Sequence, residues 1–185
     1  MRIAIVGGGG AGLFAALVLA RAGHEVLVLE RAHLEPASDV EGAAAAAFRP
    51  TAAQIVQPHI VMARCRELLR DRLPDVYGAL LAAGVAEAPI RTQMPATLAD
   101  TASRPGDERL TLLMTRRSTL NWVLQRAVLA TPGVTLRYGV RVSGLRAEDE
   151  PGDGDAWVGC VRRLGGVPDA AAMTRSLNAH ADRVG

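Results

Sequence analysis

The sequence predicts an α/β fold in which a βαβ unit of parallel strands opens the chain and a partial second lobe is inserted after it. Three observations lead to this prediction. A short apolar run at 2–6 is followed by consecutive glycines and then by strong helix formers at 13–22. A second apolar run occupies 26–29, and a third occupies 134–138. Short apolar runs that alternate with helical segments are typical of buried parallel strands.

Length and composition exclude several classes of protein. With 185 residues the chain is long enough for one domain or one and a half. Half of the residues are hydrophobic, which excludes global disorder. All 21 basic residues are arginine, so neither a Walker phosphate loop nor Schiff-base chemistry is available. Acids and bases alternate without a basic block and aromatic residues are few, so we expect no nucleic-acid partner.

The two cysteines give an expectation about metals and location. Cys65 and Cys160 lie far apart and lack the CxxC spacing of zinc sites. We therefore expect no metal site and no disulfide framework, and we expect a reducing, cytoplasmic compartment.

The uncharged segment 3–20 has three interpretations. A membrane-spanning helix would contain five glycines, which disfavours it, and we expect no membrane span. A signal peptide would begin at Arg2 and end at the small residues around Arg21, but glycines would interrupt its apolar region. In the third interpretation, 2–6 is a strand, 13–22 is a buried helix that is apolar nearly all round, and Gly23 ends this helix.

The glycine run matches the GxGxxG pattern of dinucleotide-binding turns, with Gly7, Gly9 and Gly12 in its three places. Gly7 allows the tight turn, Gly9 lets backbone amides approach a diphosphate, and Gly12 lets the helix lie close to the sheet. The helix start at Gly10 and Ala11 supplies unpaired N–H donors.

An acidic residue completes the dinucleotide pattern. Glu30 follows the second strand, eighteen residues after Gly12, where its carboxylate can accept hydrogen bonds from ribose hydroxyls. A carboxylate repels a 2′-phosphate, so the sequence predicts a site for FAD or NAD rather than NADP.

The middle of the chain interrupts the βαβ pattern. Residues 31–48 are predicted to be a loop, whose five alanines fit either a short helical turn or a mobile linker. Two short amphipathic helices are predicted at 64–73 and 74–83, with Pro74 in the first turn of the second. Strand-like segments that are interrupted by prolines are predicted at 88–106, and a strand is predicted at 109–114.

The pattern then returns to a helix and a strand. A helix is predicted at 118–130 with Ser118 as its cap, and 134–138 is the candidate third parallel strand. Residues 141–146 and 156–163 flank an acidic, glycine-rich turn and are predicted to form a β-hairpin. A terminal helix is predicted at 168–183.

Three stretches resemble FAD-dependent oxidoreductases of the p-hydroxybenzoate hydroxylase type, the flavoprotein monooxygenases. They are 3–31, with GGGGAG followed by HEVLVLER; 49–64, RPTAAQIVQPHIVMAR; and 115–142, which begins TRRSTLNWVLQR. In the second stretch Arg49, Gln54 and His59 match a family segment, while Ala53 and Gln57 depart from it. In the third, Arg117 matches an arginine that reaches the cofactor in relatives.

The resemblance implies FAD as cofactor and a Rossmann-type domain, with NAD(P)H as a candidate electron donor and a small organic molecule as substrate. It implies an FAD-binding domain from 1–48 and 115–165, a partial substrate-side lobe from 49–114 and a tail from 166–185. No catalytic residue is identified. The candidate cofactor contacts are Gly7, Gly9, Gly10, Ala11, Gly12, Glu30, Arg31 and Arg117, with Arg49 and Gln54 as further candidates.

The resemblance covers 2–148 and then stops. The Gly-Ala-Asp-Gly turn and the Gly-Asp motif of relatives do not follow, so the sequence is interpreted as a truncated, split or frame-shifted flavoprotein. Two alternatives stay open. One is a non-catalytic remnant, or half of a split enzyme completed by a second chain; the other is an NAD-dependent dehydrogenase, which would leave Arg117 unexplained.

Overall fold

The structure is a computed structural model that describes residues 1–33, 37–48, 54–95 and 97–143. The chain divides into two compact units, the first from residues 1–34 and 131–185 and the second from residues 35–130. The predicted hairpin and terminal helix lie at or beyond the end of the described residues. The predicted assignment of functional domains, which places 115–130 with the FAD-binding part, stays a prediction.

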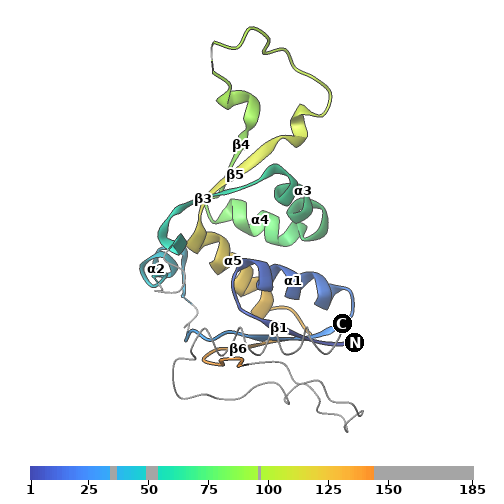
Figure 1. Cartoon of the computed structure of the whole chain (residues 1–185), viewed down its shortest axis with the longest axis vertical. Coiled ribbons are helices and arrows are strands. Elements are labelled where there is room, and N and C mark those ends of the chain that lie inside the picture. Colours follow the sequence, from blue (N-terminus) through green and yellow to red (C-terminus); the bar gives the residue numbers. More distant parts are fainter. Residues whose placement is uncertain (34–36, 49–53, 96, 144–185) are drawn as a thin grey trace, which may run out of the picture. The chain divides into compact units, whose positions relative to one another are not determined.

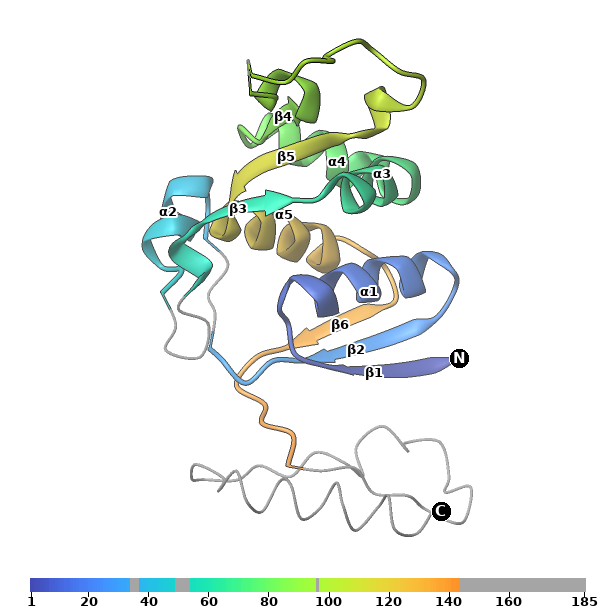
Figure 2. The same ribbon diagram turned by 45° about the horizontal axis from the view of Figure 1, so that its top comes forward.

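The first unit is the predicted βαβ sheet. It contains β1 (Arg2–Val6), α1 (Gly10–Arg21), β2 (Glu25–Leu29) and β6 (Val134–Arg137). The strands are parallel in the order β1-β2-β6, which confirms the predicted third strand. Figure 2 shows α1 lying across one face of this sheet.

The core of the first unit lies between β2 and α1. Four consecutive residues of β2 from Val26 to Leu29 are buried, as are Leu13 and Leu17 of α1. After α1 the chain turns at Gly23, whose φ of 85° is the left-handed conformation predicted for this helix end. The helix begins at Gly10, three residues before its predicted start.

Two burial predictions for the first unit are wrong. The apolar strand β1 is exposed or half-buried along its whole length, and Val6 is 61% exposed. Among the described residues β1 pairs only with β2, so it is an edge strand. Helix α1 is apolar nearly all round, yet Val18 is exposed because α1 packs against the sheet along one side only.

The second unit combines an antiparallel sheet with helices (Figure 1). Its strands pair in the order β3-β5-β4. Helix α3 packs against α4 and β5, and α5 packs against α2 and α4. Its elements are α2 (Val40–Ala45), β3 (Pro58–Val61), α3 (Ala63–Arg72), α4 (Pro74–Ala82), β4 (Ala86–Pro89), β5 (Thr111–Arg116) and α5 (Arg117–Leu129), with single 3₁₀ turns at Ile90–Gln93 and Asp107–Arg109.

The paired helices α3 and α4 confirm the prediction, with Pro74 in the first turn of α4. Of the strand-like pieces predicted at 88–106, only the first residues belong to a strand, β4, because a 3₁₀ turn follows at once. The predicted cap of α5 is wrong. Arg116 occupies the cap position without a side-chain hydrogen bond, and Ser118 is buried inside the helix.

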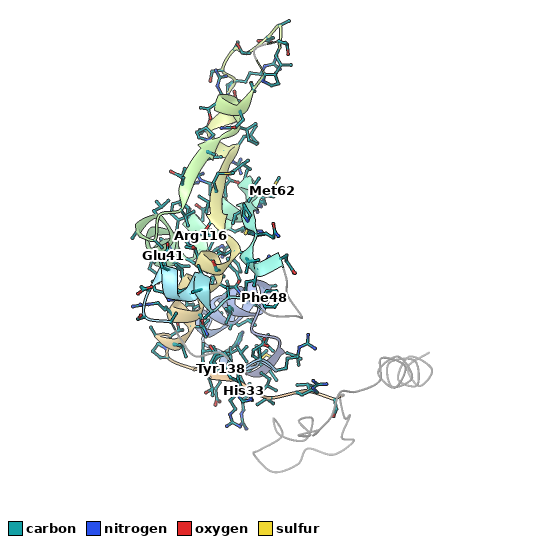
Figure 3. All side chains as sticks on the ribbon, turned by 90° about the vertical axis from the view of Figure 1, so that its left-hand side faces the viewer. His33, Glu41, Phe48, Met62, Arg116 and Tyr138 are labelled. Carbon is teal, nitrogen blue, oxygen red and sulfur yellow. The ribbon has the colours of Figure 1, made fainter. Side chains whose placement is uncertain are left out.

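The alanine-rich segment forms α2 rather than a linker. The Asp39 carboxylate caps this helix by accepting a hydrogen bond from the Gly42 amide at 2.7 Å. Trp122 of α5 donates its indole N–H to the Ala37 carbonyl at 2.9 Å. Glu41 and Arg116 form an exposed ion pair at 2.6 Å, and Figure 3 shows both side chains. No helix among the described ranges is long and apolar enough to cross a membrane.

Candidate functional site

The glycine turn joins β1 to α1, and its glycines differ in how much room they leave for a side chain. Gly7 has a φ of 104°, which favours glycine, and its amide donates to the Leu29 carbonyl at 2.8 Å. A Cβ atom on Gly12 would lie 2.0 Å from the Gly7 carbonyl oxygen. The first turn of α1 therefore approaches the end of β1 more closely than any side chain allows, as predicted for the third glycine of the pattern.

The N-terminus of α1 is open. Gly9 precedes the helix with φ −77° and ψ 176°, and a Cβ built on it meets no heavy atom within 4 Å. No side chain caps this end and no acidic residue lies in the first turn. The first amides of a helix have no partner within the helix, so Gly10, Ala11 and Gly12 offer N–H groups and a partial positive charge to an anion.

Glu30 lies directly across from the turn. It is 8% exposed, and its Oε2 accepts a hydrogen bond from the Gly8 amide at 2.6 Å. Its Oε1 accepts from the Ala32 amide at 2.8 Å. Its own amide donates to the Arg137 carbonyl of β6 at 2.8 Å, which fixes the backbone at this edge of the sheet. The structure thus brings the predicted acid and the predicted glycines together.

Gly8 was missed by the sequence reasoning. The GxGxxG pattern allows any residue at its second position. Only the fold shows that Gly8, which occupies this position, is buried against Glu30. The spacing of the pattern carries no signal for this contact, because the two residues are 22 positions apart.

Other residues surround the carboxyl ends of β2 and β6. Arg31, a candidate cofactor contact, is exposed beside Glu30. The His33 ring lies against Gly139, where an added Cβ would be 2.3 Å from its Cε1 atom, and Figure 3 labels His33. Gly139 has a φ of 70°, so both its conformation and its neighbour favour glycine.

The other candidate contacts belong to the second unit. Arg117 begins α5, is half-buried, and donates its amide to the Gln57 carbonyl at 3.3 Å. The Gln57 amide donates in turn to the Gln54 carbonyl at 3.1 Å. Backbone hydrogen bonds through Gln57 therefore connect the two candidates Arg117 and Gln54. Burial and, second, the positive charge of Arg117 lower the pKa of His59. Arg49 lies outside the described residues.

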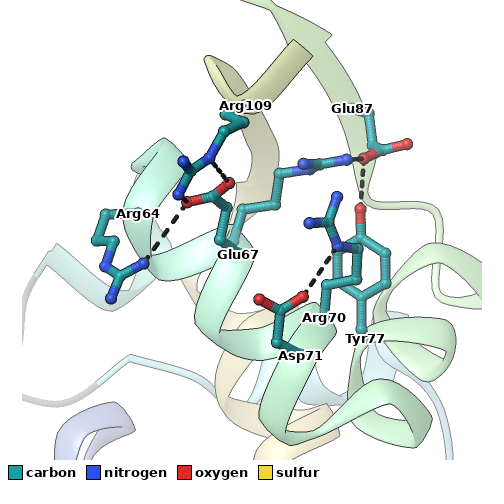
Figure 4. Close-up of polar contacts among 8 residues, drawn as sticks. Arg64, Glu67, Arg70, Asp71, Tyr77, Glu87 and Arg109 are labelled. Carbon is teal, nitrogen blue, oxygen red and sulfur yellow. Dashed lines mark hydrogen bonds and ion pairs between the residues drawn. The ribbon is translucent and has the colours of Figure 1, made fainter. Parts of the chain in front are cut away.

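The second unit also contains a polar cluster that the sequence did not indicate (Figure 4). Arg66 is 8% exposed and donates its Nε to Glu87 at 2.7 Å, and the Tyr77 hydroxyl bonds the same carboxylate. Glu67, 6% exposed, accepts a hydrogen bond from Arg109 at 2.8 Å. These contacts join α3 and α4 to β4 and to the turn before β5, so the cluster has a structural role.

The residues of the first unit fit a dinucleotide. The turn around Gly9 has space where a side chain would otherwise stand, and the helix end offers amides to a diphosphate. Glu30 offers acceptors to ribose hydroxyls at the adjoining strand end. An FAD molecule bound there would supply redox chemistry from its flavin ring, while the protein positions it.

Comparisons with solved structures show which known folds the chain resembles. In structure the chain is similar to PqsL, a probable FAD-dependent monooxygenase from Pseudomonas aeruginosa, with a TM-score of 0.53 and 13% identity over 80% of this chain and 36% of that one. It is also similar to 2-methyl-3-hydroxypyridine-5-carboxylic acid oxygenase, with a TM-score of 0.51 and 18% identity over 78% of this chain and 33% of the other. The chain therefore spans about a third of the length of these neighbours.

Sequence comparison identifies the family. No curated protein matches the chain. The family described as FAD dependent oxidoreductase matches residues 2–183, nearly the whole sequence. The open glycine turn, the buried acid opposite it and this match lead to one conclusion: the chain belongs to the FAD dependent oxidoreductase family, and its fold is similar to about a third of each of the two oxygenase chains named above.

Proposed function

We propose that this chain binds FAD for a flavin-dependent monooxygenase that acts on a small organic substrate, with NAD(P)H as electron donor. One observation carries the proposal: an uncapped helix N-terminus at a side-chain-free turn lies opposite a buried carboxylate. The family match favours FAD over the NAD-dependent alternative. The cytoplasmic location expected from the separated cysteines stays a prediction.

The proposed roles follow from the chemistry of each group. The amides of Gly10, Ala11 and Gly12 bind the diphosphate, and the Glu30 carboxylate accepts hydrogen bonds from the ribose of the adenosine half. Arg31 and Arg117 are the cations proposed to pair with phosphate, and Arg117 is supported by the family motif alone. The flavin performs the oxidation, so no side chain described here needs to act as an acid or base.

The names of two structural neighbours suggest which substrates to try first. One neighbour is an oxygenase of 2-methyl-3-hydroxypyridine-5-carboxylic acid. PqsL was solved with 2-aminobenzoylacetate and aligns with a TM-score of 0.56 and 13% identity over 36% of its chain. Both named compounds combine an aromatic ring with a carboxylate. We propose small aromatic acids as the first class to be screened.

FAD binding by the purified chain tests the proposal. Titration with FAD, followed by flavin fluorescence, should saturate at one equivalent, whereas NAD at the same concentrations should not compete. Gly9→Val should weaken FAD binding by at least tenfold because its side chain fills the space left for the diphosphate. Gly78→Ala, in the interior of α4 with no neighbour within 4 Å, serves as the control. A protein that binds neither nucleotide would overturn the proposal.

A second candidate is half of a split flavoprotein or a non-catalytic remnant. It is favoured by strand β1, which among the described residues pairs only with β2 and is exposed or half-buried along its length. Size-exclusion chromatography and NAD(P)H oxidation distinguish the possibilities. A cofactor-free monomer that stays inactive supports the remnant. A stable hetero-complex with the product of the adjoining reading frame, active only together, supports the split enzyme.

A further inference from the structure

The Glu30 carboxylate is held from two sides by backbone amides. The Gly8 amide reaches Oε2 from the glycine turn at 2.6 Å, and the Ala32 amide reaches Oε1 from the segment after β2 at 2.8 Å. The Gly8 contact is buried and spans 22 residues. Hydrogen bonds to a charged, buried acceptor are stronger than those between neutral groups. One side chain therefore connects the turn that precedes α1 to the end of the neighbouring strand.

The count of acceptor positions makes this arrangement specific to a carboxylate. An ionised carboxylate has about four acceptor positions and no donor. The amides of Gly8 and Ala32 use two of them, one on each oxygen, which leaves two for further donors. A primary amide of the same shape has only one oxygen. Gln at position 30 would direct its own N–H group at one of the two amides, so it could not replace Glu30.

The space around Gly8 points to the same contact. A Cβ on Gly8 would lie 3.1 Å from the Glu30 Cβ and 3.3 Å from its Oε2, which is closer than side chains normally approach. A Cβ on Gly9 would meet no heavy atom within 4 Å. Position 8 is thus restricted by Glu30 itself, whereas position 9 is open within the protein.

We propose that Glu30 is a positioning residue that holds the glycine turn in its binding conformation before any cofactor arrives. Its carboxylate keeps the Gly8 and Ala32 amides bound in the cofactor-free protein and retains two acceptor positions for further donors. The identity of the nucleotide rests on the proposed function, but the anchoring of the turn does not. The anchor is therefore tested without cofactor.

Amide hydrogen exchange, followed by NMR on the full chain without cofactor, is the deciding experiment. In Glu30→Gln the Gly8 or the Ala32 amide should exchange about ten- to hundredfold faster, because one bond to a buried charge is lost. The Val26 amide, which donates to the Gly133 carbonyl at 2.8 Å, is the internal reference and should keep its rate. The matched control is Glu25→Gln on the same strand, whose carboxylate is exposed.

Unchanged exchange at both Gly8 and Ala32 in Glu30→Gln would overturn the proposal. Equal acceleration at Val26 would also overturn it, because Glu30 would then stabilise the whole sheet rather than the turn. A second pair of variants checks the steric argument. Gly8→Ala should displace the carboxylate and speed exchange of the Ala32 amide several-fold, whereas Gly9→Ala should leave it unchanged. Faster exchange of the Ala32 amide in Gly9→Ala than in Gly8→Ala would contradict the positioning role of Glu30.

FAD titration of the same variants separates this proposal from the proposed function. If Glu30→Gln releases the turn while the unsubstituted chain binds no FAD, the anchor is correct and the FAD assignment is wrong. If the unsubstituted chain binds FAD and Glu30→Gln binds it equally well with unchanged amide exchange, the positioning role is wrong and the FAD assignment survives.

Discussion

The two sheets of this protein use polar groups in different ways. At the carboxyl end of β1 and β2 the polar contacts are made by backbone amides, glycines and one carboxylate. Over the antiparallel sheet they are made by long charged side chains, in which Arg66 and Glu67 of α3 are paired with Glu87 and Arg109. In the first arrangement the end of α1 has no capping side chain and Gly9 has no neighbour within 4 Å of an added Cβ, whereas in the second the charged side chains pair with one another.

This difference predicts how each region responds to substitution. A site made from the backbone depends on the absence of side chains at its crowded positions, so adding a single methyl group at Gly12 is damaging there. A cluster made from side chains depends on paired charges, so removing one partner is damaging there. The variants below test this contrast, in order of decreasing expected effect.

Gly12→Ala should have the largest effect. Its Cβ would overlap the Gly7 carbonyl oxygen, and a backbone atom cannot rotate away. We expect the free energy of unfolding to fall by about 3 kcal/mol or more, measured by urea denaturation followed by circular dichroism. Gly78→Ala in α4 is the control and should gain about 0.5–1 kcal/mol, because alanine is the better helix former and nothing lies nearby. Similar stability of the two variants would show that the turn does not need glycine at position 12.

Arg66→Ala should have the next largest effect. It removes a buried guanidinium, its hydrogen bonds to Glu87 and its packing over the Tyr77 ring at 5.8 Å. Glu87 is partly exposed and can be rehydrated, so we expect a loss of about 1–3 kcal/mol in the same denaturation experiment. Arg70→Ala on the same helix, where the arginine is exposed, should change stability by less than about 0.5 kcal/mol. Equal losses would mean that the cluster does not stabilise the second unit.

The same cluster predicts a dependence of stability on pH. The hydrogen bond from Tyr77, followed by that from Arg66, lowers the pKa of Glu87 below its ordinary value of 4.5. A lowered pKa in the folded state means that this contribution is fully present above about pH 4.5 and is lost as the pH falls through the folded-state pKa.

Thermal unfolding between pH 3 and pH 7 measures this contribution. As the pH falls from 7 to 3, the unfolding temperature of Glu87→Gln should decrease less steeply than that of the unsubstituted chain. Part of the slope should persist, because Arg109 lowers the pKa of Glu67 in the same way. Identical acid slopes in the two proteins would contradict a lowered pKa at Glu87.

The smallest effect is expected at the far end of β2. Glu25 and Arg2 form an ion pair at 3.6 Å with both side chains largely exposed. Exposed pairs contribute about 0–1 kcal/mol, so Glu25→Gln should leave the unfolding midpoint nearly unchanged. A loss as large as that of Arg66→Ala would show that exposed and buried pairs are equivalent here, and the contrast between the regions would disappear.

Local patterns predicted the elements of the first unit but not their burial. The apolar runs and the glycine turn determine β1, α1, β2 and β6, because strand and turn preferences act over a few residues. The same apolar pattern predicted that β1 is buried, and it is exposed because burial depends on which elements cover a strand. The prediction of the α5 cap is wrong for a related reason: Ser118 is buried inside the helix rather than placed at its start.

Sequence alone determined the parallel unit, the glycine turn and the acid that follows β2, since each depends on neighbours along the chain. Only the tertiary structure decided that Glu30 binds Gly8, that β1 is an edge strand, and that Arg66 is buried against Glu87. These contacts join residues about 20 positions apart. Their energies come from desolvation and hydrogen-bond geometry, which exist only after the chain has brought the groups together.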